Sequence, residues 1–517
     1  MSPSPTSAPP RRGLRIALLA AYFDNEYEWA ICKGVRGAVE EAGGSVLYIA
    51  GAGLSDPNPG HQARASLYNL VDSSTADAIL SVSGVIGHFV GTAATGAWLQ
   101  KFGLPVASVG IADGVPSVSI DDARGIVQLI EHLVLQHDRK RIAFVSGIPT
   151  NPQANKRLEA YYTGLREFGL TPDPKLVVPG DFTRESGTRA MCELFDLRQV
   201  KVSEFDAIIA ANDYMAFGVV DELVRRRISV PDQLAVVGFD DITLARYHEP
   251  SLSTVRQPLD QLGREAVRLL FDRLDQKPVA ESNELSTELV LRRSCGCVPT
   301  DIPGATDEGG GELDETREVL PALAAEINGA TGAFARALDP LLRRLAAGSS
   351  YQLEQNRKLA DELATRLRLA RGDLIHERLH KLSRQLYSRM FSPRAQLSTL
   401  LAEHLPHLGL DECVVSEFVP DKGRTELRLS FGFSAEELQP QSVTYPTRQI
   451  VPPGFPNLRR RSVLALPLCY GDELLGIAVM PAIDGDGSLY ESLAQSFGVV
   501  LKSMDLRRRA EARSGPA

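Results

Sequence analysis

Three polar residues of types that recognise hydroxyl-bearing molecules lie near the ends of short apolar runs. Arg157, Asn212 and Asp240 offer a guanidinium, an amide and a carboxylate. A carboxylate accepts two hydroxyl protons, a guanidinium donates two hydrogen bonds in one plane, and an amide does either. The set predicts a binding site for a polyhydroxylated molecule.

The elements that would position these residues alternate between strands and helices from residue 14 to 293. The expected strands are LRIALLAAY, SVLYIAG, AILSV, PVASVG, RIAFVSG, KLVVPG, AIIAAN and LAVVGFD. Near-continuous apolar strands joined by amphipathic helices predict an α/β fold with a parallel sheet covered on both faces. Ligands of such sheets bind beyond the carboxyl ends of the strands. The segments 22–29, 151–157, 212–213 and 240–241 fall at those ends.

A structural role is the alternative for the same side chains. Asp240 and Asp241 could cap a turn, and Arg157 could pair with Glu159 or Asp181. We favour the ligand role because several residues with complementary hydrogen-bonding groups fall at strand ends.

The segment LAVVGFDDITLARYHEPSLSTVRQPLDQLGREAV resembles the end of the ligand-binding core of LacI/GalR-type regulators. SIDDARG, KRIAFVSG, AIIAANDYMAFG and ELVLRRSCGC stand in the family's order, so the resemblance spans residues 14–298. It implies a periplasmic-binding-protein-like type I fold, whose two Rossmann-like lobes close over a sugar or nucleoside-like effector, and a dimer. The positions matching the family's ligand contacts are Asp121, Arg157, Asn212 and Asp240. Tyr27 and Trp29 follow the first strand, where the family places ring-contacting residues.

Composition excludes several classes of protein. The 517 residues are 44% hydrophobic and 23% charged, as in globular proteins, and the net charge of -9 gives no overall attraction to nucleic acid. The sequence contains no run of 18 apolar residues, so it predicts no membrane-spanning helix. Six cysteines are too few for a disulfide framework. The sequence lacks GxxxxGK[ST] and GxSxG motifs. We therefore expect a cytoplasmic protein that is not an enzyme and has no cofactor.

Cys295-Gly296-Cys297 has no other cysteine or histidine nearby in the sequence. The spacing is also too close for the usual CxxC redox motif. We expect these residues to mark the end of a domain and to bind no metal.

The N-terminal segment 1–13 is rich in proline and serine and is expected to be a disordered tail. A LacI-type repressor begins with a helix-turn-helix, and a recognition helix does not fit in this segment. The expectation is weak binding to duplex DNA without sequence preference.

Residues 299–315 are rich in glycine, proline and acidic side chains and predict a linker. Residues 316–394 predict helices with apolar residues at spacings of three and four. That stripe consists of Ala360, Leu363, Leu367, Ala370, Leu374, Ile375, Leu379, Leu382 and Leu386. It favours a parallel homodimeric coiled coil over 355–390. The alternative is a helix that packs on its own chain.

Residues 376–510 contain the alternating segments DECVVSEFV and TELRLSFGF, then the hairpin SVLALPLCYGDELLGIAVM and a closing helix. This order resembles a GAF-type sensory domain, and 511–517 is expected to be a tail. The favoured interpretation is a ligand-responsive regulator that relays lobe closure through the helices to this module or to a partner output protein. The alternative is a transcription regulator acting on DNA directly or through a partner.

Overall fold

The computed structural model describes residues 13–297, 375, 378–389, 394–420, 422–434, 443–483 and 487–514. The expected tail, linker and most of the coiled-coil segment lie outside these residues. The chain divides into two units, Met1–Val298 with Leu379–Ala517, and Pro299–Arg378. Every element below belongs to the first unit. Within the described ranges, each helix is too short or too polar to cross a membrane.

The first lobe is built on a parallel sheet in the order β11-β5-β4-β3-β1-β2. Its strands are β1 (Arg15–Ala20), β2 (Ser45–Ala50), β3 (Ala78–Val82), β4 (Val106–Val109), β5 (Ser117–Ile120) and β11 (Ser282–Leu285). Its helices are α1 (Glu26–Glu41), α2 (Pro59–Ala65), η1 (Ser66–Leu70), α3 (Ser83–Ile86), α4 (Gly91–Gln100) and α10 (Leu259–Leu274). Helices α1 and α10 pack closely, since a Cβ on Gly34 would lie 2.1 Å from the Asp260 carbonyl oxygen.

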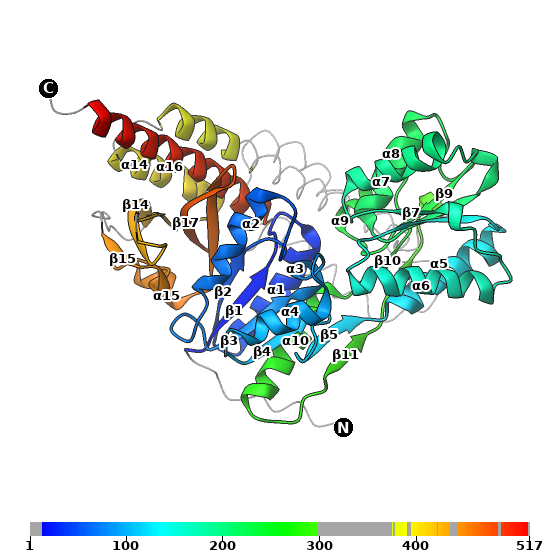
Figure 1. Cartoon of the computed structure of the whole chain (residues 1–517), viewed down its shortest axis with the longest axis horizontal. Helices are drawn as coiled ribbons and strands as arrows, with labels where there is room; N and C mark the ends of the chain where they lie inside the picture. Colours follow the sequence, from blue (N-terminus) through cyan, green and yellow to red (C-terminus); the bar gives the residue numbers. More distant parts are fainter. Residues whose placement is uncertain are drawn as a thin grey trace, which may run out of the picture. The chain divides into compact units, whose positions relative to one another are not determined.

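The second lobe holds a four-stranded parallel sheet in the order β7-β6-β8-β9. Helices α5 and α6 cover one face and α7 and α8 the other (Figure 1). The strands are β6 (Ile142–Ser146), β7 (Val177–Pro179), β8 (Ala207–Ala210) and β9 (Ala235–Val237). The helices are α5 (Asp122–His137), α6 (Pro152–Glu167), η2 (Pro174–Leu176), α7 (Arg184–Cys192), η3 (Glu193–Leu197), η4 (Val202–Glu204), α8 (Asp213–Arg225), α9 (Thr243–Tyr247) and η5 (Arg293–Cys295).

The chain passes between the lobes three times: from β5 to α5, from β10 (Thr254–Arg256) to α10, and from β11 to β12 (Glu288–Val290). Strands β10 and β12 form an antiparallel pair beside the second and third crossings. The predicted two-lobed α/β fold with parallel sheets is confirmed for the described residues. Most interior strands are largely apolar runs because both faces are covered, while β5 carries the buried Ser117 and Ser119.

The C-terminal region forms an antiparallel sheet in the order β16-β17-β13-β14-β15. Its strands are β13 (Glu412–Phe418), β14 (Glu426–Ser434), β15 (Thr444–Pro446), β16 (Val463–Tyr470) and β17 (Glu473–Pro481). Its helices are α14 (Arg394–His404), η7 (Leu405–Leu408), η8 (Thr447–Gln449), α15 (Pro456–Arg460) and α16 (Ser488–Ser514). The expected strands, hairpin and closing helix are thus present, while the likeness to a GAF domain stays a prediction.

This C-terminal sheet continues the sheet of the first lobe. Strand β16 pairs in parallel with β2, from Val463 opposite Leu47 to Ala465 opposite Ile49. The Ser462 hydroxyl accepts a hydrogen bond from the Val46 amide at 3.0 Å. One sheet of eleven strands results. The sequence analysis treated the two regions as separate modules and did not foresee this pairing.

The apolar stripe of the helix at 378–388 packs on its own chain. Leu379, Leu382 and Leu386 are buried although only one chain is present. The Ser383 hydroxyl lies 2.9 Å from that of Ser496 in α16. For these three leucines the predicted intermolecular coiled coil is therefore wrong. They pack within their own chain, as the alternative stated. The rest of the stripe, except Ile375, lies outside the described residues.

Candidate functional site

Arg157 occupies the centre of a buried charged cluster. It lies in the first half of α6, and its side chain is 5% exposed. The Nε atom donates to Asp122 Oδ1 at 2.7 Å, and Nη1 donates to the Ala211 carbonyl at 2.5 Å. The guanidinium carbon lies 3.8 Å from the centroid of the Phe239 ring. These contacts fix the guanidinium plane, so that a ligand would meet a preorganised donor.

Asp122 is the first residue of α5, immediately after the crossing from β5. Its carboxyl is almost fully buried, and burial raises its pKa while the charge of Arg157 opposes that rise. The residue predicted for the site was the neighbouring Asp121, whereas Asp122 is the one paired with Arg157. The position of Asp122 in the helix is the signal that could have identified it. The side chain of the first helical residue points in a different direction from that of the N-cap residue.

Asp240 lies beyond the end of β9 and faces the same guanidinium. Its Oδ1 is 3.8 Å from Arg157 Nη1 and accepts a hydrogen bond from Gln257 Nε2 at 2.6 Å. Burial raises the pKa of Asp240 to about 7, in spite of the lowering effect of Arg157. The backbone φ of Asp240 is 122°, a value that side chains of L-residues rarely adopt. A strained, buried carboxylate of this kind often has a functional role.

Tyr27 belongs to the same electrostatic environment. Burial is the main factor raising the pKa of its phenol, and the charges of Asp240 and Arg157 act on it with opposite signs. Tyr27 follows the N-cap of α1 in the first lobe, whereas Arg157 and Asp240 come from the second. The structure thus brings two of the six predicted site residues, Arg157 and Asp240, within 3.8 Å of each other, and their charges act on the pKa of Tyr27.

Two acceptor atoms of this cluster have no hydrogen-bond partner within the described residues. They are Asp122 Oδ2 and Gln257 Oε1, and both are buried. An unsatisfied buried polar atom costs about 1–3 kcal/mol, so native proteins pair such atoms with water or with a ligand. A molecule carrying hydroxyl groups supplies the donors that these two oxygens lack.

Asp121 and Asn212 act as helix caps. Asp121 Oδ1 accepts from the Arg124 amide at 3.0 Å and caps α5. Asn212 Oδ1 accepts from the Met215 amide at 2.9 Å and caps α8, while its Nδ2 donates to the Phe182 carbonyl at 3.0 Å. Polar residues after parallel strands serve as helix caps as readily as ligand contacts.

Trp29 lies away from Arg157, in an aromatic cluster. Its ring centroid is 5.8 Å from that of Phe23, 6.2 Å from Tyr48 and 5.8 Å from Tyr490 in α16. The prediction that Trp29 covers a ligand ring therefore has no support from this arrangement.

Asp241 is a partner in two ion pairs, a structural role different from the turn cap that the alternative envisaged. It pairs with Arg256 at 2.7 Å and with the buried Arg292 at 2.7 Å. Neither Glu159 nor Asp181 is the partner of Arg157, since Asp122 takes that place.

Contacts between the lobes surround the cluster. Asn151 Nδ2 donates to the Gly84 carbonyl at 3.0 Å, and the Thr243 amide donates to Glu26 Oε1 at 2.8 Å. Both bonds join the first lobe to the second. They lie close in sequence to Arg157 and Tyr27, so a change in lobe separation would act on the charged cluster.

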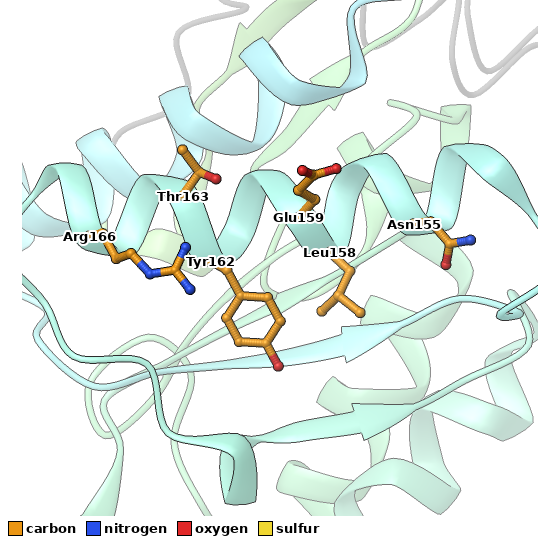
Figure 2. A pocket seen from close by; sticks show the side chains of 6 residues that line it. All are labelled: Asn155, Leu158, Glu159, Tyr162, Thr163 and Arg166. Atoms are coloured by element: carbon orange, nitrogen blue, oxygen red, sulfur yellow. The ribbon is translucent and has the colours of Figure 1, made fainter.

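A shallow groove runs along the outer face of α6 (Figure 2). Its lining residues all come from this single helix: Asn155, Leu158, Glu159, Tyr162, Thr163 and Arg166. They project from one helical face in the picture, whereas Arg157 is buried. We assign no ligand site to this groove.

The fold also corrects one expectation about cysteine. His132 and His137 of α5 lie next to Cys295 and Cys297, although more than half of the domain separates them in sequence. The expectation that no histidine lies near these cysteines is therefore wrong. The cluster is distinct from the one around Arg157.

Part of this chain is similar in sequence to known proteins. A model described as "Periplasmic binding protein-like domain" matches residues 130–295. The HTH-type transcriptional repressor CytR of Escherichia coli (strain K12) is 34% identical over 186 residues, covering 36% of this chain and 53% of CytR. The HTH-type transcriptional regulator CelR of Thermobifida fusca is 35% identical over 206 residues, covering 38% and 58%.

The chain thus spans about half the length of the curated relatives it matches. Among solved structures, a complex of transcriptional regulator CelR with cellobiose is 29% identical, with a TM-score of 0.47 over 56% of this chain and 86% of that one. Residues 130–295 therefore carry a periplasmic-binding-protein-like domain similar to those of LacI/GalR-type regulators.

Proposed function

We propose that this protein is a cytoplasmic, non-enzymatic regulator that binds a small polyhydroxylated metabolite, a sugar or nucleoside-like molecule, between its two lobes. The observation that carries the proposal is the buried cluster of Arg157, Asp122 and Asp240. Burying these charged side chains without a ligand costs free energy, because they lose their hydration.

The chemistry of the cluster suits neighbouring hydroxyl groups. Among the described residues, Asp122 Oδ2 and Gln257 Oε1 are buried acceptors without partners, and Asp240 adds a carboxylate. Arg157 is held flat against Phe239 and can donate to a ligand oxygen. Donors and acceptors in such proximity favour a molecule that offers both, as a sugar or ribose does.

The relatives support a regulatory role over an enzymatic one. CytR and CelR are named as transcriptional regulators, and each matches this chain at about a third identity. Ligand binding between two lobes is a two-state device, because a ligand that prefers the closed form shifts the population toward it.

The proposed route of the signal runs from the lobes to the C-terminal region, which we take to be GAF-like, and from there to a partner output protein. The pairing of β2 with β16 supports a mechanical link, since the two regions share one sheet. The second candidate is a transcription regulator that acts on DNA directly or through a partner. The names of the relatives favour that candidate.

A ligand screen tests the binding function. Thermal shift and titration calorimetry with pentoses, hexoses, disaccharides and nucleosides should identify a ligand that stabilises the full chain. Asp240→Ala should then weaken binding by about tenfold or more, because it strands the ligand's hydroxyl groups. The matched control is Asp232→Ala, an exposed aspartate before β9. Wild-type affinity in Asp240→Ala would remove this site from consideration.

A second experiment separates the two routes of output. Electrophoretic shifts with genomic fragments, at several salt concentrations, measure sequence-specific DNA binding. Co-purification with and without the identified ligand detects a partner protein. A salt-resistant specific complex with DNA would favour the transcription regulator, and a ligand-dependent partner would favour the relay.

A further inference from the structure

Two histidines and two cysteines converge at the end of the periplasmic-binding-protein-like domain. His132 and His137 come from the last turns of α5, and Cys295 and Cys297 from η5 and the residues after it. One ligand atom from each residue lies within 4.8 Å of the other three. We propose that these four side chains bind a structural zinc ion, a site that does not depend on the proposed effector.

The distances between the ligand atoms fit a tetrahedral ion. His132 Nε2 lies 3.2 Å from His137 Nε2, 3.4 Å from Cys295 Sγ and 3.5 Å from Cys297 Sγ. His137 Nε2 lies 3.3 Å from Cys297 Sγ. Zinc–nitrogen bonds of about 2.0 Å and zinc–sulfur bonds of about 2.3 Å separate tetrahedral ligand atoms by about 3.3–3.8 Å.

Hydrogen bonds alone do not account for this convergence. A neutral imidazole nitrogen carries either one proton or one lone pair, so it makes one good hydrogen bond. His132 Nε2 faces three partners at once. A metal ion that accepts electron pairs from all four atoms satisfies them together.

The backbone between the two cysteines is adapted to this arrangement. Gly296 has a φ of +107°, and a Cβ placed on it would lie 3.2 Å from Cε1 of His137. The conformation therefore favours glycine at this position, and a larger residue would also press on the His137 ring. The tight turn lets two cysteines separated by one residue reach the same point.

A further contact supports the metal ligands. The Ser253 hydroxyl lies 3.1 Å from Cys295 Sγ, and Ser253 is fully buried. A hydroxyl near a thiolate orients it and stabilises its charge, as groups around metal ligands commonly do. All six cysteines of the chain are free thiols, so neither ligand is consumed in a disulfide.

The ligand set selects the ion and indicates its role. Two thiolates and two imidazoles in tetrahedral array favour zinc over magnesium or calcium, which prefer oxygen. Four protein ligands leave no open position, as is typical of structural sites. The ion would fasten the segment 293–297, where the domain ends, to the end of α5.

Metal analysis of the full chain tests the proposal. The protein should be prepared without a metal-affinity tag, and elemental analysis should find about one zinc per chain. After chelation, cobalt should restore the site with visible d–d bands and thiolate-to-cobalt charge transfer. Cys297→Ser and His137→Gln should lose the metal and the charge-transfer signal in part or in full. Cys192→Ser, which changes a cysteine elsewhere in the same lobe, should retain both.

Stability separates the structural role from chance binding. Chelation should lower the melting temperature of the wild type and of Cys192→Ser, but leave the two ligand variants unchanged. Circular dichroism checks that each variant is folded. Wild-type protein that neither contains zinc nor binds added zinc or cobalt would overturn the proposal. A Cys295–Cys297 disulfide in protein kept under reducing conditions would overturn it as well.

Discussion

Arg157 and Asp122 form a buried ion pair that joins α6 to the first turn of α5. Arg157 Nε lies 2.7 Å from Asp122 Oδ1, and the two side chains are 5% and 1% exposed. Such a pair contributes little net stability, because both charges have been removed from water. The pair instead holds two groups in position at the crossing between the lobes. These are one edge of the Arg157 guanidinium and the Asp122 oxygen that has no hydrogen-bond partner among the described residues.

Removing one partner of this pair should destabilise the protein strongly. Asp122→Ala leaves Arg157 buried with only the more distant Asp240 for compensation. We expect a loss of about 3–5 kcal/mol in the free energy of unfolding, measured by urea denaturation. The control is Glu284→Ala, which breaks the half-exposed pair with Lys156 and should cost less than about 1 kcal/mol. Equal effects of the two changes would contradict the buried pair.

The pH dependence of stability should report on Asp240. Burial raises its pKa from 3.8 to about 7. Between these values the folded protein holds a proton that the unfolded chain has released, so this group lowers the free energy of unfolding as pH rises. Asp240→Asn removes the titration, and its stability relative to the wild type should increase by at least about 1 kcal/mol from pH 4 to pH 8.

Urea midpoints at several pH values, measured without ligand, provide the test of the Asp240 titration. Asp232→Asn, at an exposed position, is the matched control and should show no such trend. A parallel pH profile for Asp240→Asn and the wild type would show that Asp240 is ionised throughout this range.

Leu382 should matter for folding of the C-terminal region. It is fully buried against its own chain, so Leu382→Glu places a charge in an apolar core. We expect a loss of several kcal/mol in stability, and protein that is partly unfolded by near-ultraviolet circular dichroism. Ser388→Glu changes an exposed residue of the same helix and should be tolerated. A Leu382→Glu protein that stays fully folded but becomes monomeric would instead support the predicted coiled coil between two chains.

Ser462 should stabilise the junction between β2 and β16. Its hydroxyl accepts from the Val46 amide at 3.0 Å and donates to Glu40 at 2.6 Å. Ser462→Ala leaves a buried amide without a partner and should cost about 1–3 kcal/mol. Ser503→Ala, which removes a hydroxyl bonded within α16, should cost less. Hydrogen exchange should show faster exchange at Val46 in Ser462→Ala, and unchanged exchange there would argue against the pairing.

Local patterns were sufficient to predict most of the fold. The strands of both lobes are short apolar runs, and their separation by amphipathic helices indicates parallel pairing. The pairing of β2 with β16 was not predictable in this way. An edge strand that accepts a remote strand has the same apolar pattern as any other buried strand.

The candidate site was predicted in part for a related reason. Arg157 and Asp240 stand at strand ends, where a general rule places ligand contacts. That rule does not distinguish a ligand contact from a helix cap, so Asp121 and Asn212 were chosen and Asp122 was missed. Trp29 and the histidine–cysteine cluster depend on contacts between residues far apart in sequence, about which local patterns say little.

The pairing of β2 with β16 also affects the order in which the protein is assembled during synthesis. Residues 45–50 leave the ribosome well before residues 463–470, because the contact from Val46 to Ser462 spans 416 positions. Until then, β2 presents an unpaired edge with free amide and carbonyl groups, which other chains can pair with. The nascent protein should therefore depend on chaperones, and slow translation of the residues between β2 and β16 should increase aggregation.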